Sequence, residues 1–178
     1  MPNPCYVAIG LDLSLRSTGI ATNGEPIVLQ TDLLGVQRLA WLRDSIIALV
    51  KVENNPAVFV EGYSFASKNS QSHAAGELGG VIRLALWEQG IPYVDIPPTT
   101  RAKFATGRGN ASKSEVVSAV SARTGIVWSG KGGDDRCDAW ILREMGRVWL
   151  GQNELDWPQL NLSALEKIDW SPLEGNKK

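Results

Sequence analysis

Residues 6–13 read YVAIGLDL, an apolar and β-branched run that contains one acid, Asp12. Such a run is typical of a buried strand. Strand character resumes at Thr18–Thr22 and at Ile27–Thr31 after short turn segments, so we expect three antiparallel strands. An acid within an apolar strand is costly unless other groups compensate it, so Asp12 is the first candidate functional residue.

Helical periodicity then alternates with two further strands. The expected elements, in chain order, are a helix over Val36–Glu53, a strand over Ala57–Glu61, a helix over Gln71–Gln89, a strand over Ile91–Ile96, a short helix over Thr99–Ala105, a helix from Ser112 to about Thr124 and a helix ending near Leu150. Leaving out the short helix over Thr99–Ala105, this βββαβαβαα order predicts an α/β fold with a mixed sheet. We expect residues 1–150 to form one domain and residues 151–178 to form a C-terminal extension that packs on it or trails from it.

Local signals mark several helix ends. Ser112 and Glu115 have the spacing of a capping box, and Asp134 or Asp135 is expected to cap the last helix of the domain. The helix over Gln71–Gln89 contains Gly76, Gly79 and Gly80. Each costs about 1 kcal/mol relative to alanine within a helix, so we expect close packing against another backbone to compensate.

Composition excludes several classes of protein. The 178 residues are 43% hydrophobic and 21% charged, which is typical of a globular domain. Two cysteines provide no disulfide framework, and a single histidine excludes a His-x-x-x-His zinc helix. No apolar run of membrane-spanning length and no secretion signal is found, so we expect a cytoplasmic protein without membrane contact.

Four carboxylates lie at positions where a metal ion would explain them. Asp12 lies within one apolar strand, Glu61 ends a second, and Asp135 and Asp138 are three residues apart on one helix face. Oxygen ligands favour a hard cation such as Mg²⁺ or Mn²⁺. Each acid also has a simpler interpretation: a turn at Asp12, a solvated strand end at Glu61 and a helix cap at Asp135.

A second feature is the basic stretch from residue 99 to residue 114, which has no acid although the net charge of the chain is −1. Its basic residues are Arg101, Lys103, Arg108 and Lys113. We expect these side chains to contact nucleic-acid phosphates, while Lys113 alone is equally consistent with a solvated surface lysine.

These motifs, taken in order, resemble the RuvC family of Holliday junction resolvases in the ribonuclease H-like superfamily. The matching segments are Ile9–Ser14 with Thr18-Gly19, Phe59–Glu61, Gly79–Val81, Gly107–Lys113 and Asp135-x-x-Asp138. The resemblance covers about residues 7–147. The tryptophan-containing tail after Gly151 matches nothing in the bacterial proteins and fits a divergent, phage-type member, which would act in the host cytoplasm.

The resemblance implies a ribonuclease H-like sheet of five strands, three antiparallel followed by two parallel, flanked by helices. It implies that Asp12, Glu61, Asp135 and Asp138 hold two Mg²⁺ ions, with Mn²⁺ able to substitute, and that Lys113 stabilises charge on the scissile phosphate. Tyr63 and Phe65 follow the catalytic strand. They are expected to stack on opened DNA, although core packing is the commoner fate of aromatic residues.

The activity implied is a structure-selective endonuclease that resolves four-way junctions by paired nicks with 5′-phosphate ends. The resemblance also implies a homodimer, with the glycine-rich helix from Gln71 as the interface. Two alternatives remain open. One is a ribonuclease H-like nuclease acting on flaps, forks or RNA–DNA hybrids, and the other is a catalytically silent junction-binding protein.

Overall fold

The computed structural model describes residues 5–62 and 70–174. A five-stranded sheet in the order β3-β2-β1-β4-β5 forms its centre. The strands are β1 Val7–Asp12, β2 Thr18–Ala21, β3 Ile27–Leu29, β4 Pro56–Glu61 and β5 Tyr93–Ile96. β1, β2 and β3 pair antiparallel, whereas β4 runs parallel to β1 and β5 parallel to β4. This confirms the predicted mixed sheet.

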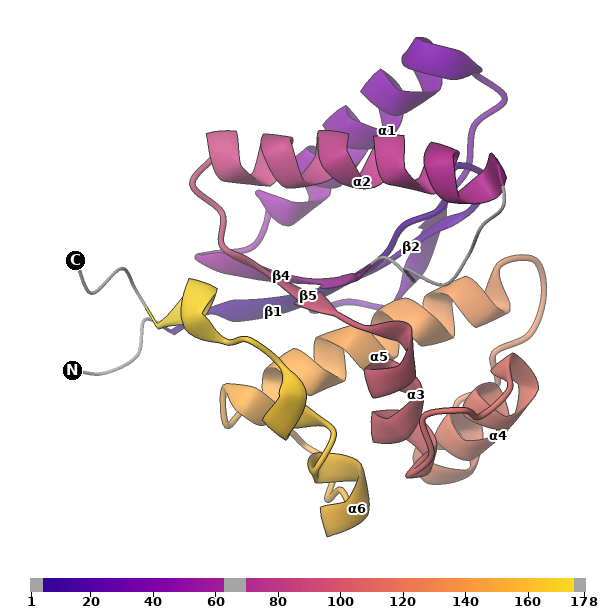
Figure 1. Cartoon of the computed structure of the whole chain (residues 1–178), viewed down its shortest axis with the longest axis vertical. Helices are drawn as coiled ribbons and strands as arrows, with labels where there is room; N and C mark the ends of the chain where they lie inside the picture. Colours follow the sequence, from indigo (N-terminus) through magenta and orange to yellow (C-terminus); the bar gives the residue numbers. More distant parts are fainter. Residues whose placement is uncertain (1–4, 63–69, 175–178) are drawn as a thin grey trace.

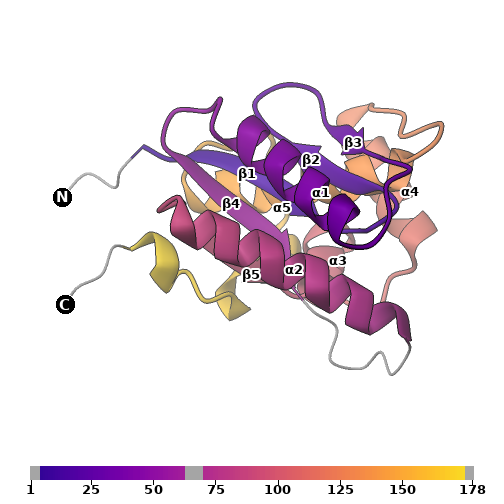
Figure 2. The same ribbon diagram turned by 90° about the horizontal axis from the view of Figure 1, so that it is seen from above.

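Helices cover both faces of the sheet (Figure 1). The helices are α1 Gly35–Val50, α2 Ser70–Glu88, α3 Pro98–Thr106, α4 Lys113–Thr124, α5 Gly133–Trp149 and α6 Gln159–Leu162, followed by the 3-10 turns η1 Leu165–Lys167 and η2 Ser171–Leu173. Seen from above, α1 and α2 lie side by side across one face (Figure 2), while α5, α3 and α4 lie on the other. Two apolar clusters therefore fill the space on either side of the sheet.

Helix α5 lies directly against β1 and β2 because glycines face it. A Cβ atom on Gly10 would lie 1.9 Å from the Ala139 carbonyl oxygen, and one on Gly19 would lie 2.1 Å from the Asp135 carbonyl oxygen. Real Cβ atoms do not approach backbone this closely. These two glycines thus set the depth at which α5 packs, and with it the position of the acids on α5.

The segment after α5 returns along the same face of the sheet as α5. Trp157 is buried and its ring lies 4.2 Å from that of Phe104, centroid to centroid. Trp170 stacks on Trp149 at 4.9 Å, and Ile168 and Leu173 are buried in the same apolar cluster. Residues 151–174 thus add to the core rather than extend away from it.

The capping box at Ser112 is confirmed, because the Ser112 side chain accepts from the Glu115 N–H and the Glu115 carboxylate accepts from the Ser112 N–H. The cap expected at Asp134 or Asp135 is wrong. Helix α5 begins at Gly133, and its N-cap is Gly132 in the left-handed conformation, with φ of 73°. Only a residue tolerant of positive φ suits that position, so the helix starts before either aspartate.

The close packing expected at the glycines of α2 is not found at Gly76 or Gly80 within the described part of this chain. A Cβ atom on Gly76 or on Gly80 would meet nothing within 4 Å among the described residues. Their cost to helix stability is therefore not compensated by packing within the described part of this chain.

Gly10→Ala should destabilise the protein by about 3 kcal/mol or more, because the new methyl group would overlap α5 backbone that cannot move without disturbing the sheet. Thermal unfolding followed by circular dichroism measures the effect. Gly24→Ala is the control, since a Cβ there meets nothing within 4 Å. Equal melting temperatures for the two variants would contradict the proposed role of Gly10.

Candidate active site

The register of the central strands brings two acids to the same edge of the sheet. Leu11 on β1 is paired with Val60 on β4, and each strand ends at the next residue, Asp12 and Glu61. β1 and β4 are parallel, so their carboxyl ends meet at one edge. The strand arrangement thus places two carboxylates close together that are far apart in the sequence.

Helix α5 adds two further acids to this edge. Asp135 and Asp138 are one turn apart, so both face the end of β1. The Asp138 side chain is only 3% exposed, and the Asp135 side chain is 17% exposed. All four predicted carboxylates line one pocket of about 430 Å³, which Arg101 and Lys113 also line.

Arg101 points into this pocket from α3. Its Nε donates to Glu61 Oε2, and its Nη1 donates to Asp138 Oδ1. The sequence predicted Arg101 as a phosphate contact; in the structure its guanidinium pairs with the acids themselves. Its position is the feature of the site that sequence reasoning missed, because the basic stretch showed no sign of which arginine faces inward.

Lys113 stands at the rim of the pocket. Its Nζ lies 2.7 Å from Asp134 Oδ2 and 3.7 Å from Asp135 Oδ1, and its side chain is half exposed. Burial lowers its pKa, but the hydrogen bond to Asp134 and the charges of Asp138 and Asp135 outweigh this effect, so the pKa is raised overall. Asp134 holds the lysine from outside the pocket lining, whereas Asp135 faces into it.

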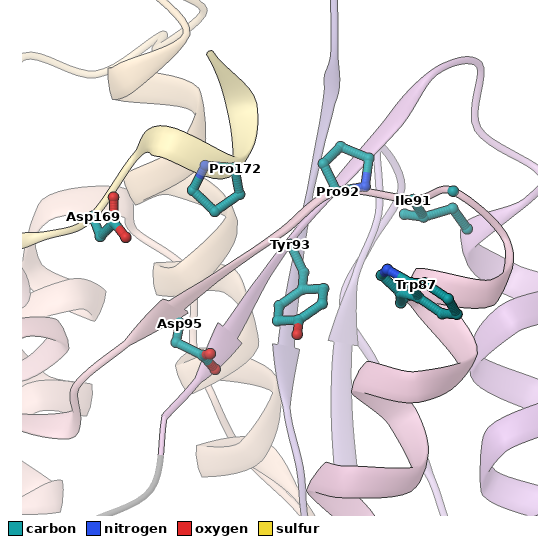
Figure 3. A pocket seen from close by; sticks show the side chains of 8 residues that line it. Trp87, Ile91, Pro92, Tyr93, Asp95, Asp169 and Pro172 are labelled. Carbon is teal, nitrogen blue, oxygen red and sulfur yellow. The ribbon is translucent and has the colours of Figure 1, made fainter. Parts of the chain in front are cut away.

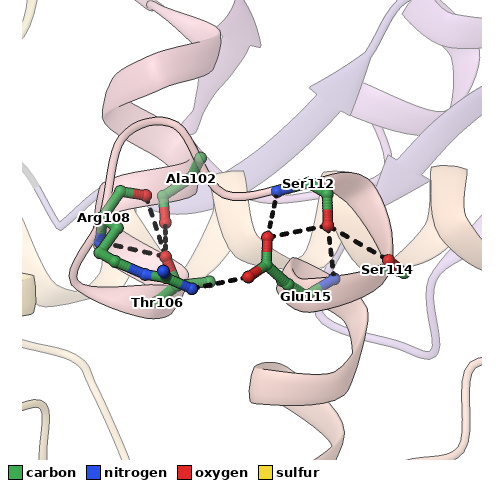
Figure 4. A network of polar contacts seen from close by, with 6 residues as sticks. All are labelled: Ala102, Thr106, Arg108, Ser112, Ser114 and Glu115. Atoms are coloured by element: carbon green, nitrogen blue, oxygen red, sulfur yellow. Dashed lines mark hydrogen bonds and ion pairs between the residues drawn. The ribbon is translucent and has the colours of Figure 1, made fainter.

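A polar network fixes the loop between α3 and α4, which leads to Lys113 at the start of α4 (Figure 4). The Thr106 hydroxyl donates to the Ala102 carbonyl at 2.8 Å and also bonds the backbone of Arg108. Arg108 Nη2 donates to Glu115 Oε1 at 2.7 Å, and the Ser112 N–H donates to Glu115 Oε2 at 2.7 Å. The Ser112 N–H, the Ser112 hydroxyl and Arg108 together hold the pKa of Glu115 down at about 2. Glu115 thereby links the end of α3 to the start of α4.

The remaining predicted contacts lie away from the carboxylates or outside the described residues. Lys103 is on α3 but does not line the pocket, and Arg108 is exposed and paired with Glu115. Tyr63 and Phe65 lie outside the described residues. Ser14 and Thr99, which the sequence did not single out, line the pocket alongside the acids.

The electrostatics of the pocket show an excess of negative charge. Burial, then the charges of Glu61 and Asp138, raise the pKa of Asp12 well above its usual range. Burial also raises the pKa of Asp138 to about 6, although Arg101 opposes this shift. Within residues 5–62 and 70–174, no cation forms an ion pair with Asp12.

The donor set matches a hard divalent cation in its chemistry. Four carboxylates supply only oxygen ligands, and the unpaired charge of Asp12 is what such a cation would neutralise. As the side chains lie, however, no group of three or more acidic, cysteine or histidine side chains among the described residues is close enough to hold an ion. Arg101 engages two of the four acids, Glu61 and Asp138, in ion pairs.

A wider pocket of about 550 Å³ lies elsewhere, between the end of α2, strand β5 and η2 (Figure 3). Trp87, Tyr93 and Pro172 are among its lining residues. Of the residues that the structure describes, the acids that line it are Asp95 and Asp169, and no basic side chain lines it. The acids from the ends of β1 and β4 therefore meet in the carboxylate pocket and not in this wider one.

Sequence comparisons identify similar proteins over part of the chain. No family model matches. The chain is 36% identical over 85 residues to the crossover junction endodeoxyribonuclease RuvC of Chlamydia trachomatis, covering 47% of this chain and 49% of that protein. It is 28% identical over 109 residues to RuvC of Gloeobacter violaceus, covering 61% and 62%. The chain thus spans about half the length of the first of these relatives.

Solved structures agree with the sequence comparison. The structure of Thermus thermophilus RuvC in complex with a Holliday junction substrate matches with a TM-score of 0.63 and 21% identity, covering 83% of this chain and 97% of that one. A second T. thermophilus RuvC structure matches with the same TM-score. The resemblance to RuvC and the ribonuclease H-like fold are therefore confirmed.

Among the described helices, none has the length and apolar character needed to cross a membrane.

The raised pKa values of Asp12 and Asp138 predict that the metal-free protein loses stability as the pH rises. Both carboxyls bind protons more tightly in the folded state than in the unfolded chain. The free energy of unfolding should therefore fall from about pH 4, the unfolded pKa, to the folded pKa of Asp138 at about 6. Asp12→Asn removes one of these charges and should raise the melting temperature at pH 7 in EDTA.

The matched control for this measurement is Asp32→Asn, the same change at an exposed site between β3 and α1. It should leave the melting temperature at pH 7 unchanged. A lower melting temperature for Asp12→Asn than for the wild type would show that the Asp12 charge is compensated in the folded protein.

Proposed function

We propose that the protein is a metal-dependent endonuclease that resolves four-way DNA junctions. The observation that carries this proposal is the meeting of Asp12, Glu61 and the Asp135/Asp138 pair in one pocket, from two strands and one helix. The similar sequences are named crossover junction endodeoxyribonuclease, and the similar structure was solved with a Holliday junction substrate. A paired carboxylate site at strand ends suits phosphodiester hydrolysis.

The four carboxylates would hold two Mg²⁺ ions, for which Mn²⁺ would substitute. Bound in this way, the ions would supply an activated water for in-line attack and stabilise the leaving 3′ oxygen, so that the product carries a 5′-phosphate. Lys113 is positioned beside the acids with half of its side chain exposed. Its ammonium group would contact the scissile phosphate and stabilise the charge that develops there.

DNA binding is assigned to the surface next to this pocket. Lys103 lies on α3 and Arg108 lies on the loop after it. These side chains would contact backbone phosphates of the DNA arm whose scissile phosphate lies at Lys113. Tyr63 and Phe65 follow β4 directly, and we propose that they stack on bases at the opened junction. Arg101 would also contact a phosphate once its guanidinium is released from Glu61 and Asp138.

Paired nicks on two strands require two active sites, and helix α2 offers a surface for a second copy. Gly76, Gly80, Leu84 and Trp87 lie on one face of α2, within about one quarter of its circumference. Leu84 is 55% exposed and Trp87 is 73% exposed. Among the described residues, nothing lies within 4 Å of the place where a Cβ atom on Gly80 would be, so this face leaves room for another helix to approach closely.

One cleavage assay tests the activity. The full chain is incubated with a four-way junction, a flap, a fork, an RNA–DNA hybrid and a linear duplex, with Mg²⁺ and with EDTA. We expect symmetric nicks in the junction with Mg²⁺ only. Preferred cutting of flaps, forks or hybrids would replace the junction assignment with a broader nuclease, and binding without cutting would indicate a silent junction-binding protein.

Asp12→Asn and Glu61→Gln should each lower the junction cleavage rate by about a thousandfold or more, because each removes a charged ligand from the acid cluster. Junction binding in EDTA should survive, since contact with DNA comes from basic groups. Asp44→Asn, an exposed aspartate on α1, is the control and should cut normally. Near wild-type cleavage by Asp12→Asn would overturn the site assignment.

Leu84→Glu should convert the dimer to a monomer, because it places a charge at the centre of the apolar face of α2. Light scattering coupled to size-exclusion chromatography measures the mass. Val52→Glu, at an 80% exposed valine beyond α1, is the matched control and should leave the mass unchanged. A wild-type protein that runs as a monomer would refute the dimer.

A further inference from the structure

One cation bridges two different parts of the acid cluster. Arg101 donates from Nε to Glu61, at the end of β4, and from Nη1 to Asp138, on α5. The Arg101 side chain is 11% exposed, so solvent screens these pairs poorly. The planar guanidinium suits this bridge because its donors diverge at fixed angles, which a lysine ammonium does not reproduce.

This bridge takes ligands away from any metal ion. Arg101 engages one oxygen of Glu61 and one of Asp138, and the described residues contain no ready group of three metal ligands. Asp12 and Asp135 remain without contact to Arg101, Asp135 having only the 3.7 Å pair with Lys113. Until the guanidinium leaves, the pocket presents an incomplete ligand set.

Charge balance indicates when the guanidinium would leave. Four carboxylates against Arg101 and Lys113 give the pocket a formal charge of −2, which one divalent ion neutralises. A second ion would raise the formal charge of the pocket to +2. A DNA phosphate adds one negative charge beside the ions and lowers this excess, and it is also a good bidentate partner for an arginine.

We propose that Arg101 is a built-in counter-ion that competes with a divalent metal for Glu61 and Asp138, so that full metal loading is coupled to DNA binding. The inference rests on the metal-dependent function proposed above. Arg101 thereby acts as a positioning residue in the free protein: it holds the acids together against their mutual repulsion and keeps the site short of metal. On the substrate complex the same side chain is released toward the phosphate.

Mn²⁺ binding to the full chain without DNA tests the competition. Isothermal titration calorimetry compares the wild type with Arg101→Gln, which removes the competing charge but retains a polar side chain. The variant should bind Mn²⁺ about tenfold more tightly or better, since an opposite charge in contact shifts a carboxylate equilibrium by at least that factor. Lys51→Gln removes one exposed charge just after α1, at a residue that does not line the pocket. Its Mn²⁺ affinity should stay within about twofold of the wild type because exposed charges are screened.

A second measurement uses the wild type, so that a poorly folded variant does not decide the outcome. The side-chain ¹⁵Nε resonance of Arg101 is followed by NMR as Mg²⁺ and then a junction with uncleavable linkages are added. Release from Glu61 and Asp138 should shift this resonance and accelerate exchange of its proton with water. A resonance unchanged in the complex with both Mg²⁺ and the junction would overturn the inference.

The outcomes separate this inference from the proposed function. If the wild type cuts junctions with Mg²⁺ but Arg101→Gln binds Mn²⁺ no more tightly than the wild type, only the competition is refuted. If neither protein binds Mn²⁺ and the wild type cuts nothing, the metal site and the competition are both refuted. Tighter binding by Lys51→Gln equal to that of Arg101→Gln would show a general charge effect and would also overturn the inference.

Discussion

The direct contact of helix α5 with strands β1 and β2 is the constraint on which the rest of the structure depends. Gly10 and Gly19 present bare backbone to the helix, so the Ala139 and Asp135 carbonyls approach where a side chain would block them. Because the contact is made by backbone, its depth is set to within a fraction of an ångström. Asp12 ends β1, the strand that contains Gly10. Asp135 and Asp138 lie on the side of α5 that faces these strands. The packing of the core and the geometry of the site are therefore one feature.

That arrangement places the carboxylates of Asp12 and Asp138 at buried positions, where their ionised forms are disfavoured. Burial and mutual repulsion raise the pKa of both Asp12 and Asp138, which means that their ionised forms are disfavoured in the folded protein. A core selected only for stability would carry neutral side chains at these positions. Keeping four acids together despite their repulsion is the stability cost expected of a functional site, and it favours an enzyme over a silent binding protein.

Much of this fold could be predicted from the sequence, and the failures have identifiable causes. Strand runs and amphipathic helices predicted the order of elements along the chain and a mixed sheet, and the capping box at Ser112 predicted the start of α4, because these signals act within a few residues. The start of α5 was misplaced because Gly132 adopts a left-handed conformation that no side-chain signal announces. The bridge made by Arg101 depends on a side-chain direction across 37 and 40 residues of sequence, and only the folded chain decides it.

Arg101 also connects the basic stretch, residues 99–114, to the acid cluster, because it forms ion pairs with Glu61 and Asp138. Helix α3 follows β5 directly, so the strand that pairs with β4 leads straight to the residue that neutralises Glu61. From there the Thr106, Arg108 and Glu115 contacts run on to Lys113 at the rim of the pocket. A phosphate that draws Arg101 outward would therefore act on an element held at its far end to α4. The segment proposed to bind DNA and the acids proposed to hold metal ions are joined through the single guanidinium of Arg101, which gives DNA binding a direct physical path to those acids.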